Sequence, residues 1–240
     1  MTSRHFITLA AMLICVACQP HQAASQSDEA AIAQTFPKAN RPVAGLAGTE
    51  WSTEDARDKV GEAEEIMKAA RVVPGMTIAD IGAGEGYYTV RLADKVGEKG
   101  RVLAQDIDAG AIERLGERIA RERLDNVSIK TGAPDDPRLP EGSFDRIFMV
   151  HMYHEIREPY AFLWRLWPAL AKDGEVIVVD INRPLGRHGL PPDRLFCEFQ
   201  AVGYKLIGFQ ERPELGGYFA RFVAEGKRVE PSAIKACGAN

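Results

Sequence analysis

The stretch TIADIGAGEGYYTVRLADKVGEKGRVLAQD, residues 77–106, decides the fold. An apolar run typical of a buried strand opens it, and a GxGxG loop follows at Gly82, Gly84 and Gly86. Without side chains, a glycine loop lets backbone N–H groups approach a ligand closely. A second strand ends on Asp106, roughly 20 residues past the glycines, where a carboxylate can accept hydrogen bonds from both ribose hydroxyls. The stretch therefore predicts a strand, loop, helix and strand built around a nucleoside.

The spacing of the glycines separates two kinds of nucleoside site. A dinucleotide fingerprint, GxGxxG, would need its third glycine at the position of Tyr87. Asp80 stands two residues before the first glycine, and a carboxylate there suits an ammonium group better than a pyrophosphate. The motif resembles motif I of the class I S-adenosylmethionine-dependent methyltransferases, whose [D/E]-x-G-x-G-x-G loop passes under the amino-acid part of that cofactor.

The resemblance continues in order along the chain. Residues 130–145 resemble the segment that joins the third and fourth strands of the family, residues 148–156 resemble its motif IV, and residues 172–180 resemble its fifth-strand motif. It covers about residues 60–224. The implied fold is α/β, with a doubly wound, mostly parallel seven-stranded sheet of the Rossmann-like methyltransferase type.

The residue pattern agrees with that fold. Strands that alternate with helical stripes predict parallel pairing through crossover helices. One stripe runs from Ala56 to Ala70, and another helix should kink or end early at Pro168. Residues 204–210 and 217–224 predict a C-terminal antiparallel hairpin.

The resemblance implies S-adenosyl-L-methionine as the cofactor. The residues expected to bind it are Asp80, Gly82, Gly84, Gly86, Tyr87, Asp106, Ile107, Asp135 and His151. The sequence departs from the family at Ala133, where relatives often carry an acidic residue that meets the adenine amino group, and Asp135 is expected to replace it.

The segment HMYHE, residues 151–155, lies in the motif IV match, beside the transferred methyl group in the family. Two roles stay open for His154: a hydrogen bond that holds the loop, or a general base oriented by Glu155, which would make these two residues catalytic. No metal is expected, because HxxHE matches neither zincin pattern and side chains at i and i+3 diverge at a strand end.

The N-terminus differs from the rest of the chain. Residues 1–18 combine a positive start, an apolar run and Cys18, which predicts a signal peptide with a lipobox, although Cys15 replaces the usual leucine. Residues 19–50 read as a flexible tether, 51–226 as the methyltransferase domain and 227–240 as a tail. We expect an exported protein, periplasmic or anchored to the membrane through lipidated Cys18; a cytoplasmic protein is the alternative.

Composition limits the partners. The 240 residues are 45% hydrophobic and 27% charged, which fits one folded domain, and a net charge of -4 without a basic run argues against nucleic acid. We therefore expect a methyltransferase that acts on a small molecule; the alternatives are a non-catalytic protein that binds S-adenosylmethionine or a nucleoside, and a nicotinamide-dependent oxidoreductase. Cys197 and Cys237 are available to pair if the chain is exported, and the sequence leaves their geometry open. It does not set the oligomeric state.

Overall fold

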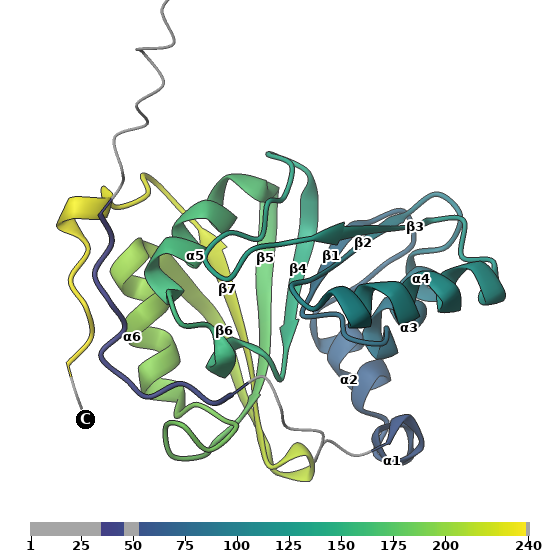
Figure 1. The fold of residues 1–240 in the computed structure, drawn as a ribbon, viewed down its shortest axis with the longest axis horizontal. Helices are drawn as coiled ribbons and strands as arrows, with labels where there is room; N and C mark the ends of the chain where they lie inside the picture. The colour runs from purple at the N-terminus through teal and green to yellow at the C-terminus, as the bar shows by residue number, and fades with distance from the viewer. Residues whose placement is uncertain (1–34, 46–52, 239–240) are drawn as a thin grey trace, which may run out of the picture. The chain divides into compact units, whose positions relative to one another are not determined.

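A seven-stranded sheet organises the protein in the computed structural model, which describes residues 35–45 and 53–238 (Figure 1). The strand order is β3-β2-β1-β4-β5-β7-β6, with β7 antiparallel to both of its neighbours and the other pairs parallel. The strands are β1 (Thr77–Ile81), β2 (Arg101–Asp106), β3 (Val127–Thr131), β4 (Phe144–Val150), β5 (Leu170–Ile181), β6 (Tyr204–Arg212) and β7 (Gly217–Ala224). The predicted sheet and its C-terminal hairpin are confirmed.

Helices cover both faces of the sheet. They are α1 (Glu54–Lys59), α2 (Glu62–Ala69), α3 (Tyr87–Val96), α4 (Ala109–Glu122), α5 (Pro159–Leu166) and α6 (Pro192–Val202), with 3-10 turns η1 (Tyr153–Glu155), η2 (Trp167–Ala169), η3 (Pro213–Leu215) and η4 (Pro231–Ala233). Buried side chains of α2 and α3 pack on one face of the sheet, and those of α5 and α6 pack on the other. Neighbouring side chains of a strand point to opposite faces, so Ile78 packs with the side chains of α2 and α3 and Ala79 packs with those of α5 and α6.

Glycine and proline set two helix boundaries. The predicted stripe from Ala56 to Ala70 is interrupted at Gly61, whose φ of 63° separates α1 from α2. Pro168 has the predicted effect, because α5 ends at Leu166 and the chain continues as the short turn η2.

Part of the predicted tether is packed on the domain. Arg41 and Ala44, both within residues 35–45, are buried. The predictions for the signal peptide, Cys18 and residues 19–34 lie outside the described residues. None of the described helices has the length and apolar character needed to cross a membrane.

The C-terminal tail is also fixed. A disulfide joins Cys197 on α6 to Cys237, and the Cys237 N–H donates to the Tyr160 hydroxyl at 2.7 Å. The tail therefore lies against α5 and α6, on the side of the sheet opposite α2 and α3.

Candidate functional site

The glycine loop between β1 and α3 is shaped by two different demands. Gly82, Gly84 and Gly86 all have positive φ values, of 70°, 55° and 89°. A Cβ on Gly82 would lie 2.8 Å from Met152 Cγ, and one on Gly86 would lie 2.5 Å from Leu115 Cδ1. A Cβ on Gly84 would meet nothing within 4 Å. The first and third glycines are thus required by packing, whereas Gly84 faces open space that a ligand can enter.

Asp106 joins the end of β2 to this loop. Its Oδ2 accepts a hydrogen bond from the Gly84 N–H at 2.8 Å, and its Oδ1 accepts from the Asp108 N–H at 2.9 Å. The Asp108 side chain has a different role from that of Asp106. It caps the N-terminus of α4 by accepting a hydrogen bond from the Ala111 N–H at 2.7 Å. Asp106 is therefore the carboxylate that contacts Gly84, and ribose binding by it stays a prediction.

Asp80 is a buried carboxylate at the end of β1. The Thr89 hydroxyl on α3 donates to its Oδ2 at 2.6 Å. Burial and the nearby charge of Asp106 raise the pKa of Asp80 to about 6, although Thr89 and Arg57 act in the opposite direction. A buried carboxylate with a raised pKa favours a cationic ligand, which would stabilise its charged form.

Tyr87 has partners within the protein. Its hydroxyl donates to Asp58 on α1 at 2.9 Å, and the guanidinium carbons of Arg57 and Arg91 lie 3.8 Å and 3.9 Å from its ring centroid. The side chain therefore ties α1 to α3, and cofactor binding by Tyr87 stays a prediction.

Two predicted cofactor residues lie on loops after β2 and β3. Ile107 directly follows β2 and is exposed, with 36% of its surface accessible. Asp135 forms an ion pair with Arg165 of α5. Cofactor binding by Ile107 and adenine binding by Asp135 stay predictions.

His151 points toward α2. It follows β4 with φ at 55°, and its Nε2 lies 3.4 Å from Glu62 Oε1. His151 and Arg57 lower the pKa of Glu62 to about 2, overcoming the opposing effect of burial. The Tyr88 hydroxyl also donates to Glu62, at 3.1 Å. His151 therefore belongs to a polar cluster around the buried carboxylate of Glu62.

His154 is oriented by Asp180, which corrects the role expected for Glu155. His154 Nδ1 lies 2.8 Å from Asp180 Oδ1 at the end of β5, and both side chains are buried. Glu155 lies on the other side of the ring, with its Oε1 3.9 Å from His154 Nε2. Because Asp180 holds Nδ1, Nε2 is the ring atom directed toward Glu155.

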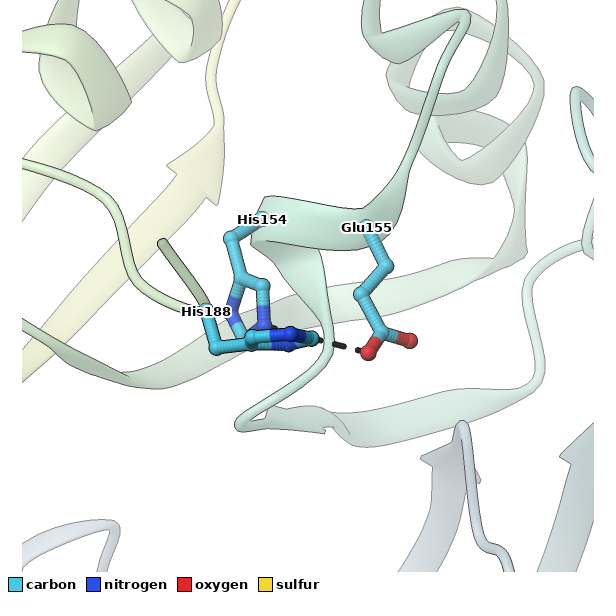
Figure 2. A group of neighbouring side chains, drawn as sticks. All are labelled: His154, Glu155 and His188. Atoms are coloured by element: carbon cyan, nitrogen blue, oxygen red, sulfur yellow. Dashed lines mark ion pairs between the residues drawn. The ribbon is translucent and has the colours of Figure 1, made fainter. Parts of the chain in front are cut away.

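A third side chain completes this group (Figure 2). His188, in the loop between β5 and α6, brings a ring nitrogen to within 4.8 Å of ligand atoms on His154 and Glu155. The Leu190 N–H donates to the Ile181 carbonyl at 2.9 Å, which folds the loop back over the end of β5. The loop thus places His188 beside a turn that is 34 residues away in sequence.

Arg41 holds the backbone of the same turn. Its Nε donates to Glu198 Oε1 at 2.8 Å, and its Nη1 and Nη2 donate to the carbonyls of His154 and Ile156, both at 3.2 Å. The Tyr153 hydroxyl donates to the same carboxylate at 2.9 Å. A guanidinium from residues 35–45 therefore fixes the turn that carries His154.

Sequence reasoning missed the roles of Asp180 and Arg41. A signal existed for Asp180, because it is an acidic residue at the end of the apolar strand segment VIVVD, as Asp80 and Asp106 are at the ends of theirs. Arg41 carried no local signal, since it reaches the site from a segment without a regular pattern. The sequence places the loop of residues 182–188 at the acceptor side, because it follows the carboxyl end of a strand, but it assigns no role to His188 itself.

An open cleft of about 1280 Å³ lies elsewhere, between α2, α3 and α4. Its lining contains charged side chains of both signs and none of the predicted cofactor or catalytic residues. The glycine loop and the strand ends beside it therefore remain the candidate site.

Comparison with known proteins identifies relatives of this chain. Residues 78–174 match the model of a family described as "Methyltransferase domain". A ubiquinone/menaquinone biosynthesis C-methyltransferase of Shewanella sp. (strain ANA-3) is 25% identical over 166 residues, which cover 66% of this chain and 61% of that protein. The chain thus spans less than two thirds of the length of these curated relatives.

Solved structures share the fold. A SAM dependent methyltransferase from Aquifex aeolicus aligns with a TM-score of 0.64 and 24% identity, covering 70% of this chain and 91% of that one. The [4+2]-cyclase SpnF aligns with a TM-score of 0.60 and 13% identity, covering 78% and 87%. The second example is named for a different reaction, so the fold alone does not specify the chemistry.

Proposed function

We propose that this chain, which belongs to the class I S-adenosylmethionine-dependent methyltransferases, transfers the methyl group of S-adenosyl-L-methionine to a small acceptor. The observation that carries the proposal is the contact between the glycine loop and the turn after β4. Met152 packs against Gly82, and this contact supports the proposal because it joins the glycine loop to the turn that carries His154 and Glu155.

The residues present fit this cofactor. Gly84 leaves room for close approach, Asp106 offers a carboxylate beside that room, and Asp80 offers a second carboxylate for the ammonium group. When bound, S-adenosylmethionine supplies a methyl group that its sulfonium has already activated. The protein therefore needs mainly to align the acceptor with the methyl carbon and to exclude water.

The acceptor side is formed by the turn with His154 and Glu155 and by the loop with His188. Both are short connections at the carboxyl ends of β4 and β5, where ligands bind in open α/β sheets. The described residues contain no added domain over this edge, and a small acceptor fits that arrangement. We expect His154 and Glu155 to affect turnover more than cofactor binding.

The test has a binding stage and a turnover stage. Calorimetry should show S-adenosylmethionine binding to the full chain, and incubation with an acceptor panel should release S-adenosylhomocysteine. Binding without turnover on a panel of phenols, amines, thiols and acidic carbon acids would favour the non-catalytic binding protein. Competition by NAD would instead favour the oxidoreductase.

A matched pair of variants locates the cofactor. Asp106→Ala should weaken S-adenosylmethionine binding by about 1.5 to 3 kcal/mol, the cost of losing charged hydrogen bonds. Asp108→Ala removes a helix cap on the same segment and should leave that affinity nearly unchanged. Equal losses in both variants would contradict a direct role for Asp106.

We also propose that the protein is exported, with Cys18 as its lipid anchor. The disulfide between Cys197 and Cys237 supports an oxidising compartment, where such bonds persist. Mass measurement of the mature N-terminus and cell fractionation test this. An unprocessed N-terminus in the cytoplasmic fraction would contradict export, and membrane attachment that survives Cys18→Ala would contradict the lipid anchor.

A further inference from the structure

We propose that His154, Glu155 and His188 form a binding site for one divalent transition-metal ion (Figure 2). The three side chains come from two loops that meet at the carboxyl ends of β4 and β5. Metal binding there does not depend on the proposed methyl transfer, although any part the ion plays in turnover rests on it.

The spacing of the ligand atoms suits a single ion. One atom from each residue lies within 4.8 Å of the other two, and His154 Nε2 is 3.9 Å from Glu155 Oε1. Zinc binds nitrogen and oxygen ligands at about 2.0 to 2.2 Å, so ligands of one tetrahedral ion lie about 3.4 Å apart. The distances between the ligand atoms must therefore shorten by at most about 1.4 Å for all three atoms to bind one ion. Small side-chain rotations can supply that change.

The group around His154 has the organisation of a metal site. Asp180 occupies the Nδ1 side of the ring at 2.8 Å, which fixes the tautomer and directs Nε2 toward Glu155. A carboxylate behind a metal-binding histidine is a recurrent arrangement that orients the ring and raises its basicity. The strand end that supplies Asp180 also anchors the His188 loop through Ile181 and Leu190, so β5 positions both imidazoles.

His188 provides an independent observation. Its Nδ1 is buried and has no hydrogen-bond partner among the described residues. A buried polar atom without a partner costs free energy, and coordination of an ion through this nitrogen would remove that cost. The rings of His154 and His188 pack with their centroids 6.0 Å apart, but this contact does not supply a hydrogen-bond partner for His188 Nδ1.

The ligand set selects a class of metal. Two imidazoles and one carboxylate suit Zn²⁺, Fe²⁺, Co²⁺ or Ni²⁺, whereas Mg²⁺ and Ca²⁺ require oxygen ligands. Three protein ligands leave at least one coordination position open, as in catalytic rather than structural sites. Because the site lies on the predicted acceptor side, that open position is available to an oxygen or nitrogen of the acceptor.

Titration calorimetry with Zn²⁺ tests the proposal on untagged full-length protein stripped of metal. Co²⁺ is the second probe, because its visible absorption reports coordination number. We expect one equivalent of Zn²⁺ to bind to wild type near neutral pH. His188→Gln and Glu155→Gln should each weaken Zn²⁺ binding at least about tenfold, and Asp180→Asn by about 10- to 100-fold.

His151→Gln is the matched control, since it removes a histidine from the same turn that faces Glu62 instead of the cluster. Its Zn²⁺ affinity should equal that of wild type. Circular dichroism checks folding, and His188→Gln, on a partly exposed loop, is the variant expected to fold most readily. Absence of Zn²⁺ and Co²⁺ binding, or equal affinity in wild type and His188→Gln, would overturn the metal site. Neither result would affect S-adenosylmethionine binding, which tests the proposed function separately.

Discussion

Replacement of Arg41 tests whether residues 35–45 hold the turn that carries His154 in place. The Arg41 and Glu198 side chains are 1% and 0% exposed and lie 2.8 Å apart. Removing one member of a buried ion pair leaves the other charge without compensation, which typically costs about 3 to 5 kcal/mol. Arg41→Ala also removes the donors to the carbonyls of His154 and Ile156. We therefore expect the free energy of unfolding to fall by about 3 to 5 kcal/mol.

Urea denaturation gives the measurement, and a second arginine provides a matched control. Arg114 and Glu85 are also 2.8 Å apart, but their side chains are 56% and 68% exposed. Arg114→Ala should cost less than about 1 kcal/mol, because exposed ion pairs are screened by water. Arg41→Ala combined with Glu198→Gln should cost less than the sum of the single changes, since the amide removes the stranded charge. A loss in Arg41→Ala as small as that in Arg114→Ala would refute the docking of residues 35–45.

The remaining predictions concern the glycine loop, Asp80 and the disulfide. Gly84→Ala should fold, because the added Cβ meets no atom within 4 Å, and the positive φ should lower its free energy of unfolding by about 1 kcal/mol. Calorimetry should show much weaker S-adenosylmethionine binding to this variant. Normal binding would mean that the loop has only a structural role. The pKa of Asp80, raised from 3.8 to about 6, means that its contribution to stability is full below about pH 4 and is lost as the pH rises through about 6. Asp80→Asn should therefore raise the free energy of unfolding at neutral pH by up to about 3 kcal/mol while weakening cofactor binding, and a destabilised variant with intact binding would contradict this. Cys197→Ser or Cys237→Ser should lower the free energy of unfolding by about 2 to 4 kcal/mol, because the bond closes a loop with a sequence separation of 40. The free energy of unfolding of wild type should fall by the same amount in dithiothreitol. An unchanged free energy of unfolding in the cysteine variants or in reduced wild type would argue against the disulfide.

The structure adds two observations that local patterns do not encode. The tether predicted for residues 19–50 followed from Pro and Gly residues that break regular elements. Residues 35–45 do lack a regular element, yet they pack on the domain because Arg41 forms an ion pair with Glu198 on α6. The exclusion of a metal rested on the spacing of His151 and His154. The structure directs His151 to α2, and His188 comes close to His154 instead.

The sequence by itself determined the glycine loop and the acidic strand end at Asp106, because each is a short pattern whose spacing follows from local backbone geometry. The seven-stranded sheet followed from the resemblance of the ordered motifs to the methyltransferase family. The hairpin was equally local, since β6 and β7 are joined by a single short turn. Only the tertiary structure decided what surrounds His154. Asp180 is 26 residues away from His154 in sequence, and the parallel pairing of β4 and β5 brings the two together. Arg41 is 113 residues away and reaches the turn from a segment without a regular element. The side chains that surround His154 depend on how the loops after the strands fold back over the sheet, and no local sequence pattern predicts that path.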